Sequence, residues 1–471
     1  MERILLPRIP DSALSLIMLL ALSGCALRHE SARSDAQQPS DATIRGILAR
    51  RVESKQSVGI VVGIANRDTS RFSAYGTFNG PGTPQVTEDT VFEIGSVTKT
   101  LTATVLADMV ARGEMALEDS VAQYLPPEVH LPSRNGKAIT LLDLATHTSG
   151  LPRFPANLNP GDDANPFADY TRQQLYAFLS SYVLPRDPGD QYEYSNLGMA
   201  LLGDALARRA AKPYEALVVE RVLGPLGMHD TRINLTPALQ RRFTSGHDAS
   251  LALQKPWDLP TLAGTGAFRS TARDMVRFVA AYARPAGTPL EQLAPLALEA
   301  RRPAGSASVS VGLGWHLVER SGNRFAAVDG QTGGYAAFTG FNTSSATSVV
   351  VLSNSARSVD DIGWHVIDPS VPVQTSFPPA RTETVLEPSS LDRFVGEYGL
   401  SSAEVITITK ERDSLWARIA GLKYQLFAEG RQEFFMKAVD AQIAFTVDAS
   451  GNTTGLTLRY GNMDFTGRKV R

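Results

Sequence analysis

The chain has 471 residues, of which 43% are hydrophobic, so it is long enough for one large domain and a smaller one. Its formal net charge is −2 and it has no basic tract, which excludes the electrostatic footprint of a nucleic-acid-binding protein. It has a single cysteine, Cys25, and therefore cannot form an internal disulfide.

The N-terminus has the pattern of an export signal. Two arginines precede an apolar run at residues 13–22 that is too short to span a bilayer comfortably, which predicts a signal peptide over residues 1–24. The run ends in Leu22-Ser23-Gly24-Cys25-Ala26, which resembles the cleavage box of bacterial lipoproteins. We therefore predict lipid attachment at Cys25 on the periplasmic face of the membrane, and Ala26 favours the outer membrane. The alternative is an ordinary signal peptide that is cleaved nearby.

Beyond this signal the chain predicts a tether and then an ordered domain. Residues 25–41 are small and polar, as in a flexible tether. We expect Asp41 to cap a helix with Ile44, Ile47, Leu48 and Val52 on one face. An apolar run, Val58–Ala65, and an alternating segment, Arg71–Phe78, then predict a β-hairpin.

Residues 42–368 are expected to form one α+β domain. Apolar segments predict helices in its middle, over residues 97–110, from Thr140 to His147, 197–209, 213–223 and, capped by Ser270, 271–281. From Gly312 the pattern changes to strands, over residues 314–319, 325–328, 335–341 and 348–352. Strands thus occur near both ends of the domain, so we predict one antiparallel sheet that joins the two ends and is flanked by helices, with an all-helical insertion.

A second domain is predicted at the C-terminus. Residues 369–388 are rich in proline and read as a linker. Residues 389–471 contain only short alternating runs divided by turns, which predicts an all-β meander of seven or eight strands.

The strongest chemical motif is Ser96-Val97-Thr98-Lys99, at the first turn of the predicted helix 97–110. Three residues separate Ser96 from Lys99, so the two side chains share one helix face. A hydroxyl beside an ammonium at a helix N-terminus is suited to be an activated nucleophile. A Ser-x-x-Lys spacing arises by chance about once or twice in a chain of this length, so the motif needs partners.

Two residues are candidates for the base that such a serine requires. His147 follows a predicted helix, although a histidine at a helix end commonly caps carbonyl groups instead. Tyr194, two residues before Asn196, precedes the predicted helix 197–209 and offers a phenol. The chain has no G-x-S-x-G elbow, no H-E-x-x-H motif and no paired Cys/His spacing, so neither a metal nor a cofactor is predicted.

Four segments occur together in one order: Ser96-Val97-Thr98-Lys99, His147-Thr148-Ser149-Gly150-Leu151-Pro152, Tyr194-Ser195-Asn196 and Thr332-Gly333-Gly334-Tyr335. This set resembles the penicillin-recognising serine hydrolases, in the branch of class C β-lactamases and D-Ala-D-Ala carboxypeptidases (peptidase S12). That branch also contains D-aminopeptidases and β-lactamase-like esterases. The C-terminal meander resembles the lipocalin-like domain often appended to these hydrolases.

The resemblance implies a role for each catalytic residue. Ser96 would be the acylated nucleophile and Tyr194 the base, while a cation at Lys99 would lower the phenol pKa of Tyr194. Asn196 would orient the substrate amide and Lys99. The class A motif E-x-x-L-N is absent, so Tyr194 would also activate the deacylating water, as in class C enzymes.

The resemblance also implies a substrate-binding strand. The backbone N–H groups of Ser96 and Gln331 would form the oxyanion hole, and Thr332 and Gly333 would bind substrate. The family carries Lys-Thr-Gly or His-x-Gly before Thr-Gly-Gly, whereas this chain has Val328-Asp329-Gly330. The cation that would meet a substrate carboxylate is therefore missing, and Asp329 would repel that carboxylate.

Three functions follow as hypotheses. The first is an exported serine hydrolase of the class C type that cleaves an amide, β-lactam or ester bond of a small-molecule or peptide substrate. The second is a carboxylesterase or D-amino-acid peptidase with little β-lactamase activity, which the missing cation favours. The third is a catalytically silent binding protein on the same fold, against which the intact set Ser96, Lys99, Tyr194 and Asn196 argues.

Overall fold

The computed structural model describes residues 38–66, 69–377, 381–400, 405–419, 421–460 and 463–471. The predicted signal peptide, Cys25 and most of the predicted tether lie outside these residues. The chain forms two compact units. Among the described residues, the first comprises those up to Arg381 together with Lys437–Asp440, and the second comprises Thr382–Met436 and Ala441–Arg471. Among the described residues, no helix is both long and apolar enough to cross a bilayer.

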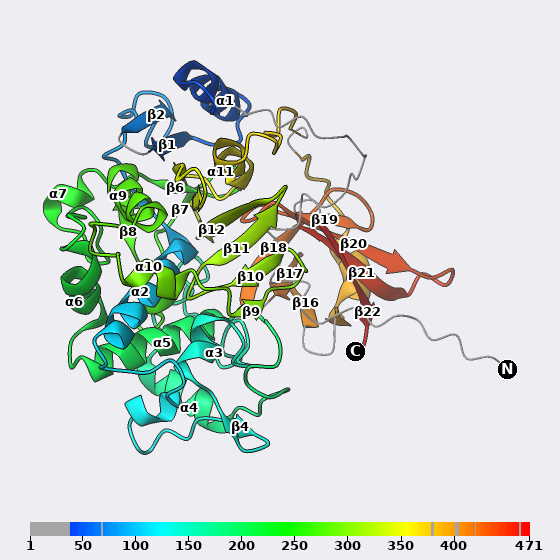
Figure 1. The fold of residues 1–471 in the computed structure, drawn as a ribbon. Helices are drawn as coiled ribbons and strands as arrows, with labels where there is room; N and C mark the ends of the chain where they lie inside the picture. Colours follow the sequence, from blue (N-terminus) through cyan, green and yellow to red (C-terminus); the bar gives the residue numbers. More distant parts are fainter. Residues whose placement is uncertain (1–37, 67–68, 378–380, 401–404, 420, 461–462) are drawn as a thin grey trace. The chain divides into compact units, whose positions relative to one another are not determined.

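An eight-stranded antiparallel sheet is the centre of the first unit (Figure 1). Its strand order is β2-β1-β14-β13-β12-β11-β10-β9. The N-terminal hairpin β1–β2 joins the later strands through β1 and β14, where Val61 lies opposite Leu352. This pairing confirms the predicted sheet that unites the two ends of the domain. The strands are β1 (Gly59–Ala65), β2 (Ser70–Gly76), β9 (Arg302–Pro303), β10 (Val309–Val311), β11 (His316–Arg320), β12 (Asn323–Gln331), β13 (Ala336–Asn342) and β14 (Ser348–Ser353).

Most of the helices lie between β2 and β9. The α-helices of the unit are α1 (Asp41–Glu53), α2 (Thr98–Ala111), α3 (Leu141–Ala145), α4 (Arg172–Ser181), α5 (Asn196–Arg209), α6 (Tyr214–Val218), α7 (Pro237–Gln240), α8 (Ala263–Gly266), α9 (Ala272–Ala283), α10 (Leu293–Ala297) and α11 (Asp360–Ile367). The helical region also contains three two-stranded pieces, β3 (Val91–Glu93) with β8 (Arg269–Thr271), β4 (Ser133–Arg134) with β5 (Lys137–Ala138), and β6 (Gly246–His247) with β7 (Leu253–Gln254).

Helices cover both faces of the sheet. Phe338 and Phe341 of β13 are three residues apart and therefore point to opposite faces. The Phe338 ring packs on Trp364 of α11, with 5.6 Å between ring centres. The Phe341 ring packs on Trp315 at 5.5 Å, and Trp315 stacks on Phe278 of α9 at 6.3 Å. Thus α11 covers one face of the sheet and α9 covers the other.

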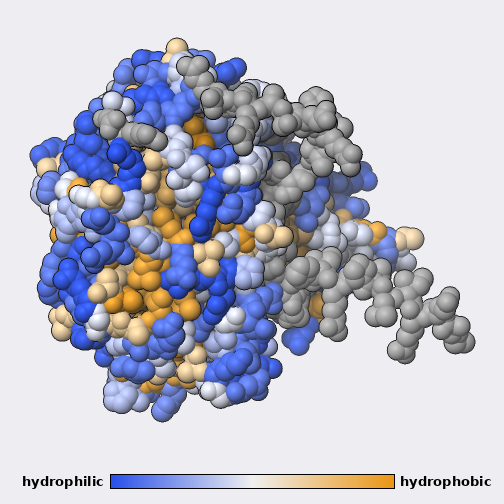
Figure 2. Space-filling model, in the orientation of Figure 1, coloured by the Kyte–Doolittle hydropathy of each residue, from blue (hydrophilic) through white to orange (hydrophobic). Residues whose placement is uncertain are grey.

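Helix α2 runs through the interior of the helical region. All residues from Thr98 to Met109 are buried, including the polar side chains among them. Hydrophilic residues cover most of the visible face of this unit, and hydrophobic residues show in its middle (Figure 2).

Two helix caps differ from the sequence predictions. The α1 helix begins at Asp41, but its cap is Ser40, whose hydroxyl accepts the Thr43 N–H. The α9 helix is capped by Thr271, whose hydroxyl accepts the Asp274 N–H, and not by Ser270. In each case a hydroxyl lies at the residue where the backbone leaves the extended region, which is the geometry that N-capping needs.

The second unit is a closed barrel of eight antiparallel strands. Each strand pairs with the next along the chain, and β15 pairs with β22 to close the barrel. Phe394 stacks on Phe445 in its core, with 4.4 Å between ring centres. The predicted β-meander is confirmed. Its strands are β15 (Gly396–Gly399), β16 (Val405–Glu411), β17 (Ser414–Ile419), β18 (Leu422–Ala428), β19 (Glu433–Met436), β20 (Ala441–Val447), β21 (Thr453–Tyr460) and β22 (Met463–Lys469).

Candidate active site

Ser96 lies on a tight turn between β3 and α2. After β3 the chain enters the 3₁₀ turn η2 (Gly95–Val97), which continues directly into α2. Gly95 has φ +50°, and a Cβ on it would lie 2.7 Å from the backbone N of Gln331. A Cβ on Gly330 would lie 2.1 Å from the carbonyl O of Ile94. The two glycines therefore allow β12 to touch the Ser96 turn backbone to backbone.

This contact brings the N–H groups of Ser96 and Gln331 to one place. The hypothetical Cβ of Gly330 would lie 3.0 Å from the Ser96 N, on the same side as the approach of Gln331 to Gly95. The Thr332 N–H bonds to the Tyr335 carbonyl within the β12–β13 ladder at 3.0 Å. Because N–H groups alternate in direction along a strand, the Gln331 N–H points away from β13. An oxyanion hole formed by these two N–H groups stays a prediction.

The Ser96 hydroxyl receives two hydrogen bonds. Lys99 Nζ donates to Ser96 Oγ at 2.8 Å, and the Tyr194 hydroxyl donates to the same oxygen at 2.8 Å. Lys99 is 2% exposed, and its Nζ lies 4.9 Å from the centre of the Tyr194 ring. The structure therefore brings together the three residues that the sequence predicted to be catalytic.

Thr265 connects Asn196 to Lys99 by hydrogen bonds, and the sequence analysis did not identify this residue. Thr265, in α8, donates its hydroxyl to Asn196 Oδ1 at 2.7 Å, and its carbonyl O accepts from Lys99 Nζ at 2.9 Å. Gly264 permits this approach, because a Cβ there would lie 2.7 Å from the Met199 carbonyl of α5. The segment around Thr265 reads as a plain turn in the sequence, so only the packing of α8 on α5 identifies the residue.

Burial moves the pKa values of Lys99 and Tyr194 in opposite directions. It lowers the pKa of the Lys99 ammonium well below its usual 10.5, with a further lowering by the charge of Arg153 and an opposing effect of Asp329. It raises the pKa of the Tyr194 phenol to about 12, although Arg153 and the hydrogen bond to Ser96 oppose the rise. The expectation that Lys99 would lower the phenol pKa is therefore not met, because burial outweighs the charges around Tyr194.

His147 supports Tyr194 and has no recorded contact with Ser96. Its ring packs against the Tyr194 ring, with 4.5 Å between centres, and its Nδ1 accepts the Ser195 N–H at 3.2 Å. Burial lowers the pKa of His147 well below 6.5, which keeps the imidazole neutral. Of the two candidate bases, the structure thus places Tyr194 at the serine and His147 behind the tyrosine.

Two predicted substrate-binding residues lie outside this hydrogen-bond network. Thr332 is 4% exposed, and its backbone N–H bonds to Tyr335. Gly333 lies against Trp257, whose indole nitrogen would be 2.8 Å from a Cβ at that position. Thr332 thus bonds within the β12–β13 turn, and Gly333 packs against Trp257.

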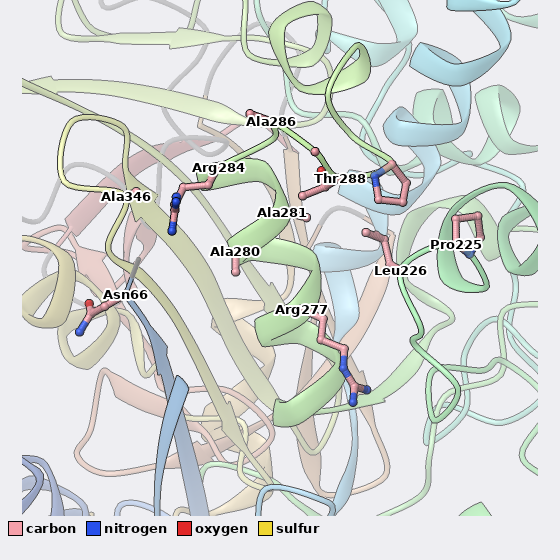
Figure 3. A pocket seen from close by; sticks show the side chains of 12 residues that line it. Asn66, Pro225, Leu226, Arg277, Ala280, Ala281, Arg284, Ala286, Thr288 and Ala346 are labelled. Atoms are coloured by element: carbon pink, nitrogen blue, oxygen red, sulfur yellow. The ribbon is translucent and has the colours of Figure 1, made fainter. Parts of the chain in front are cut away.

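A cavity of about 520 Å³ lies elsewhere in the first unit (Figure 3). It is lined mainly by α9 and the residues that follow it, including Arg277 and Ala280. Arg277 pairs with Asp274 of the same helix at 2.8 Å. None of the predicted site residues lines this cavity, so the chemistry is assigned to the site around Ser96.

Comparison with known proteins agrees with this geometry. The family model described as "Beta-lactamase" matches residues 44–368, more than half of the chain. The chain belongs to the beta-lactamase family. A second model, a domain of unknown function (DUF3471), matches residues 380–471, the region of the barrel.

Several relatives of this chain are named as hydrolases. It is 35% identical over 230 residues to the D-alanyl-D-alanine-carboxypeptidase/endopeptidase AmpH of Escherichia coli, and the match spans 48% of this chain and 57% of that protein. It is 29% identical over 269 residues to a beta-lactamase of Lysobacter lactamgenus, a match that spans 56% of this chain and 66% of the relative.

Solved structures confirm the fold. A beta-lactamase/D-alanine carboxypeptidase from Pseudomonas syringae aligns with a TM-score of 0.62 at 21% identity, over 71% of this chain and all of that chain (100%). A class C beta lactamase from Rhodobacter sphaeroides aligns with a TM-score of 0.59 at 22% identity, over 67% of this chain and 94% of that one. The predicted α+β fold with an antiparallel sheet flanked by helices is thus confirmed.

The contact between β12 and the Ser96 turn leads to a test. In the variant Gly330→Ala the new Cβ would collide with the Ile94 carbonyl, so the two N–H groups separate. We expect the rate of covalent reaction with a fluorophosphonate probe to fall roughly 100-fold or more. Gly46→Ala is the matched control, because Gly46 lies on exposed α1 with nothing within 4 Å of a Cβ, and it should react like the wild type. A wild-type rate in Gly330→Ala would contradict the assigned geometry.

Proposed function

We propose that this protein is a serine hydrolase that cleaves an amide, β-lactam or ester bond through an acyl-enzyme on Ser96. The observation that carries the proposal is the pair of 2.8 Å hydrogen bonds that Ser96 Oγ receives from Lys99 and Tyr194. A serine is a weak nucleophile unless an adjacent group removes its proton. In this site two titratable groups touch the oxygen that must lose it.

The pKa shifts divide the work between the two groups. Because burial lowers the pKa of Lys99, its amine is the group suited to accept the Ser96 proton. Because the pKa of Tyr194 is raised to about 12, its phenol keeps a proton that it can donate. Lys99 thus acts as the base during attack, and Tyr194 passes a proton to the leaving nitrogen or oxygen.

The reaction proceeds in two halves. Ser96 Oγ bonds to the substrate carbonyl carbon, and the N–H groups of Ser96 and Gln331 stabilise the negative oxygen. The bond to the leaving group then breaks as that group takes up a proton, which leaves an ester on Ser96. Water attacks this ester, loses its proton to the Lys99–Tyr194 pair, and releases the acid while Ser96 regains its hydrogen.

The names of the relatives suggest D-alanyl peptides and β-lactams as substrates. The residues on β12, however, lack the cation with which the family binds the carboxylate of such substrates. The E. coli relative is named as a D-alanyl-D-alanine carboxypeptidase/endopeptidase and others as beta-lactamases. Here Val328 is buried and apolar on β12, where the family has a cation. Burial raises the pKa of the neighbouring Asp329 carboxyl to about 6, while the charges of Lys99 and Arg153 oppose the rise. Esters and D-amino-terminal peptides are therefore the second candidate class.

The direct test of the function uses two covalent probes. Wild-type protein is expected to be labelled by a fluorophosphonate or a fluorescent penicillin, and Ser96→Ala is expected to lose the label completely. Ser70→Ala, an exposed serine on β2, is the matched control and should label normally. Absence of label on the wild type from both probes would favour a silent binding protein. Label that persists in Ser96→Ala would contradict the site assignment.

We further propose that the protein is exported and anchored by a lipid on Cys25, at the periplasmic face of the outer membrane. The support is the position of the single cysteine at the end of an apolar N-terminal run. When the full chain is expressed in a Gram-negative bacterium, Cys25→Ser should move the protein from the membrane fraction to the soluble fraction. Unchanged membrane association of Cys25→Ser would contradict the anchor.

A further inference from the structure

We infer that Arg153 is the cation that binds a carboxylate of the substrate in this site. The inference rests on the proposed function and names a residue that determines its substrate class. Val328 leaves the usual position on β12 without a cation, and Arg153 supplies one from a different element, the loop that follows α3.

The backbone of Arg153 is fixed against the catalytic tyrosine segment. The preceding carbonyl, that of Pro152, accepts the Ser195 hydroxyl at 2.8 Å. The Arg153 carbonyl accepts the Leu197 N–H at 3.1 Å. The loop is thus bonded to both sides of Asn196, so Arg153 and Tyr194 keep a constant relation.

The guanidinium lies over the ring whose hydroxyl bonds to the reacting oxygen. Arg153 Cζ is 5.0 Å from the centre of the Tyr194 ring, and the hydroxyl of that ring is 2.8 Å from Ser96 Oγ. A guanidinium that rests over an aromatic face keeps its N–H edge for other partners. One ring therefore separates this charge from the bond that would be cleaved.

Arg153 has no carboxylate partner among the residues that the structure describes. It is half-buried and forms no ion pair or side-chain hydrogen bond within this part of the chain. Arg186, in the same region and also half-buried, forms an ion pair with Glu193. A partly desolvated guanidinium favours an anion, and its planar fork fits the two oxygens of a carboxylate.

The charge of Arg153 affects the pKa values of Lys99, Tyr194 and Asp329. In addition to burial, it lowers the pKa of Lys99 and opposes the rise in the pKa of Tyr194. Asp329, from β12, is the opposite charge in the same site. A bound substrate would therefore direct its carboxylate toward the α3–α4 loop and away from β12.

Matched aryl esters test the inference. One pair carries 3-hydroxybenzoate or its neutral methyl ester as the leaving group. A second pair carries a glutaryl or a monomethylglutaryl acyl group on p-nitrophenol. We expect Arg153→Met to lower kcat/KM for the charged member of at least one pair roughly 10- to 100-fold more than for its neutral partner. Arg153→Lys should show a smaller loss, and Arg45→Met, on exposed α1, should leave both ratios unchanged.

The ratio of kcat/KM for the charged ester to kcat/KM for its neutral partner separates carboxylate binding by Arg153 from the other effects of this residue. A change in the pKa of Lys99 or Tyr194 alters both members of a pair equally and cancels. Charged-to-neutral ratios that stay at the wild-type value in both Arg153→Met and Arg153→Lys would overturn the inference, provided that both variants still react with the neutral fluorophosphonate. If the wild-type protein does not react with the fluorophosphonate, that result would instead overturn the proposed function.

Discussion

Lys99 is buried at the N-terminal turn of α2 beside Ser96, and no described carboxylate forms an ion pair with it. Its Nζ bonds only to a hydroxyl and a backbone carbonyl within the described chain, those of Ser96 and Thr265. Burial of an ammonium in such a place costs free energy that the charge of Asp329 offsets only in part, so the pKa of Lys99 falls well below 10.5. This shift favours the neutral amine, the form that the proposed mechanism needs as a base.

The rest of the first unit maintains this burial. Helix α2 is enclosed on every side, which removes water from Lys99 and fixes Ser96 at its start. The strand β12 approaches the same turn through Gly95 and Gly330, and α5 brings Tyr194 and Asn196 from the opposite direction. Each of these elements comes from a distant part of the chain, so the site exists only when the antiparallel sheet has joined the two ends of the domain.

The sequence predicted the features that depend on local pattern. The longer strands of the sheet and the helices α2, α5 and α9 followed from apolar patterning, whereas α4 and α11 were not predicted. Ser96, Lys99 and Tyr194 followed from motif spacing together with a family resemblance. Thr265 and the inferred role of Arg153 were missed because both depend on long-range contacts, the packing of α8 on α5 and of the α3–α4 loop on Tyr194. The pKa of Tyr194 was predicted in the wrong direction because the charge of Lys99 could be guessed from the motif, whereas the extent of burial could not.

The central claim is that Lys99 is the proton acceptor because it is desolvated, and the pH dependence of phosphonylation of Ser96 tests it most directly. The rate should rise with pH through the lowered pKa of Lys99 and reach its plateau well below the usual lysine value of 10.5. Because the charge of Asp329 raises that pKa, Asp329→Asn should move the rise to lower pH, and Asp329→Glu should leave it in place. A rise centred near pH 10.5, or one that Asp329→Asn moves to higher pH, would contradict the account.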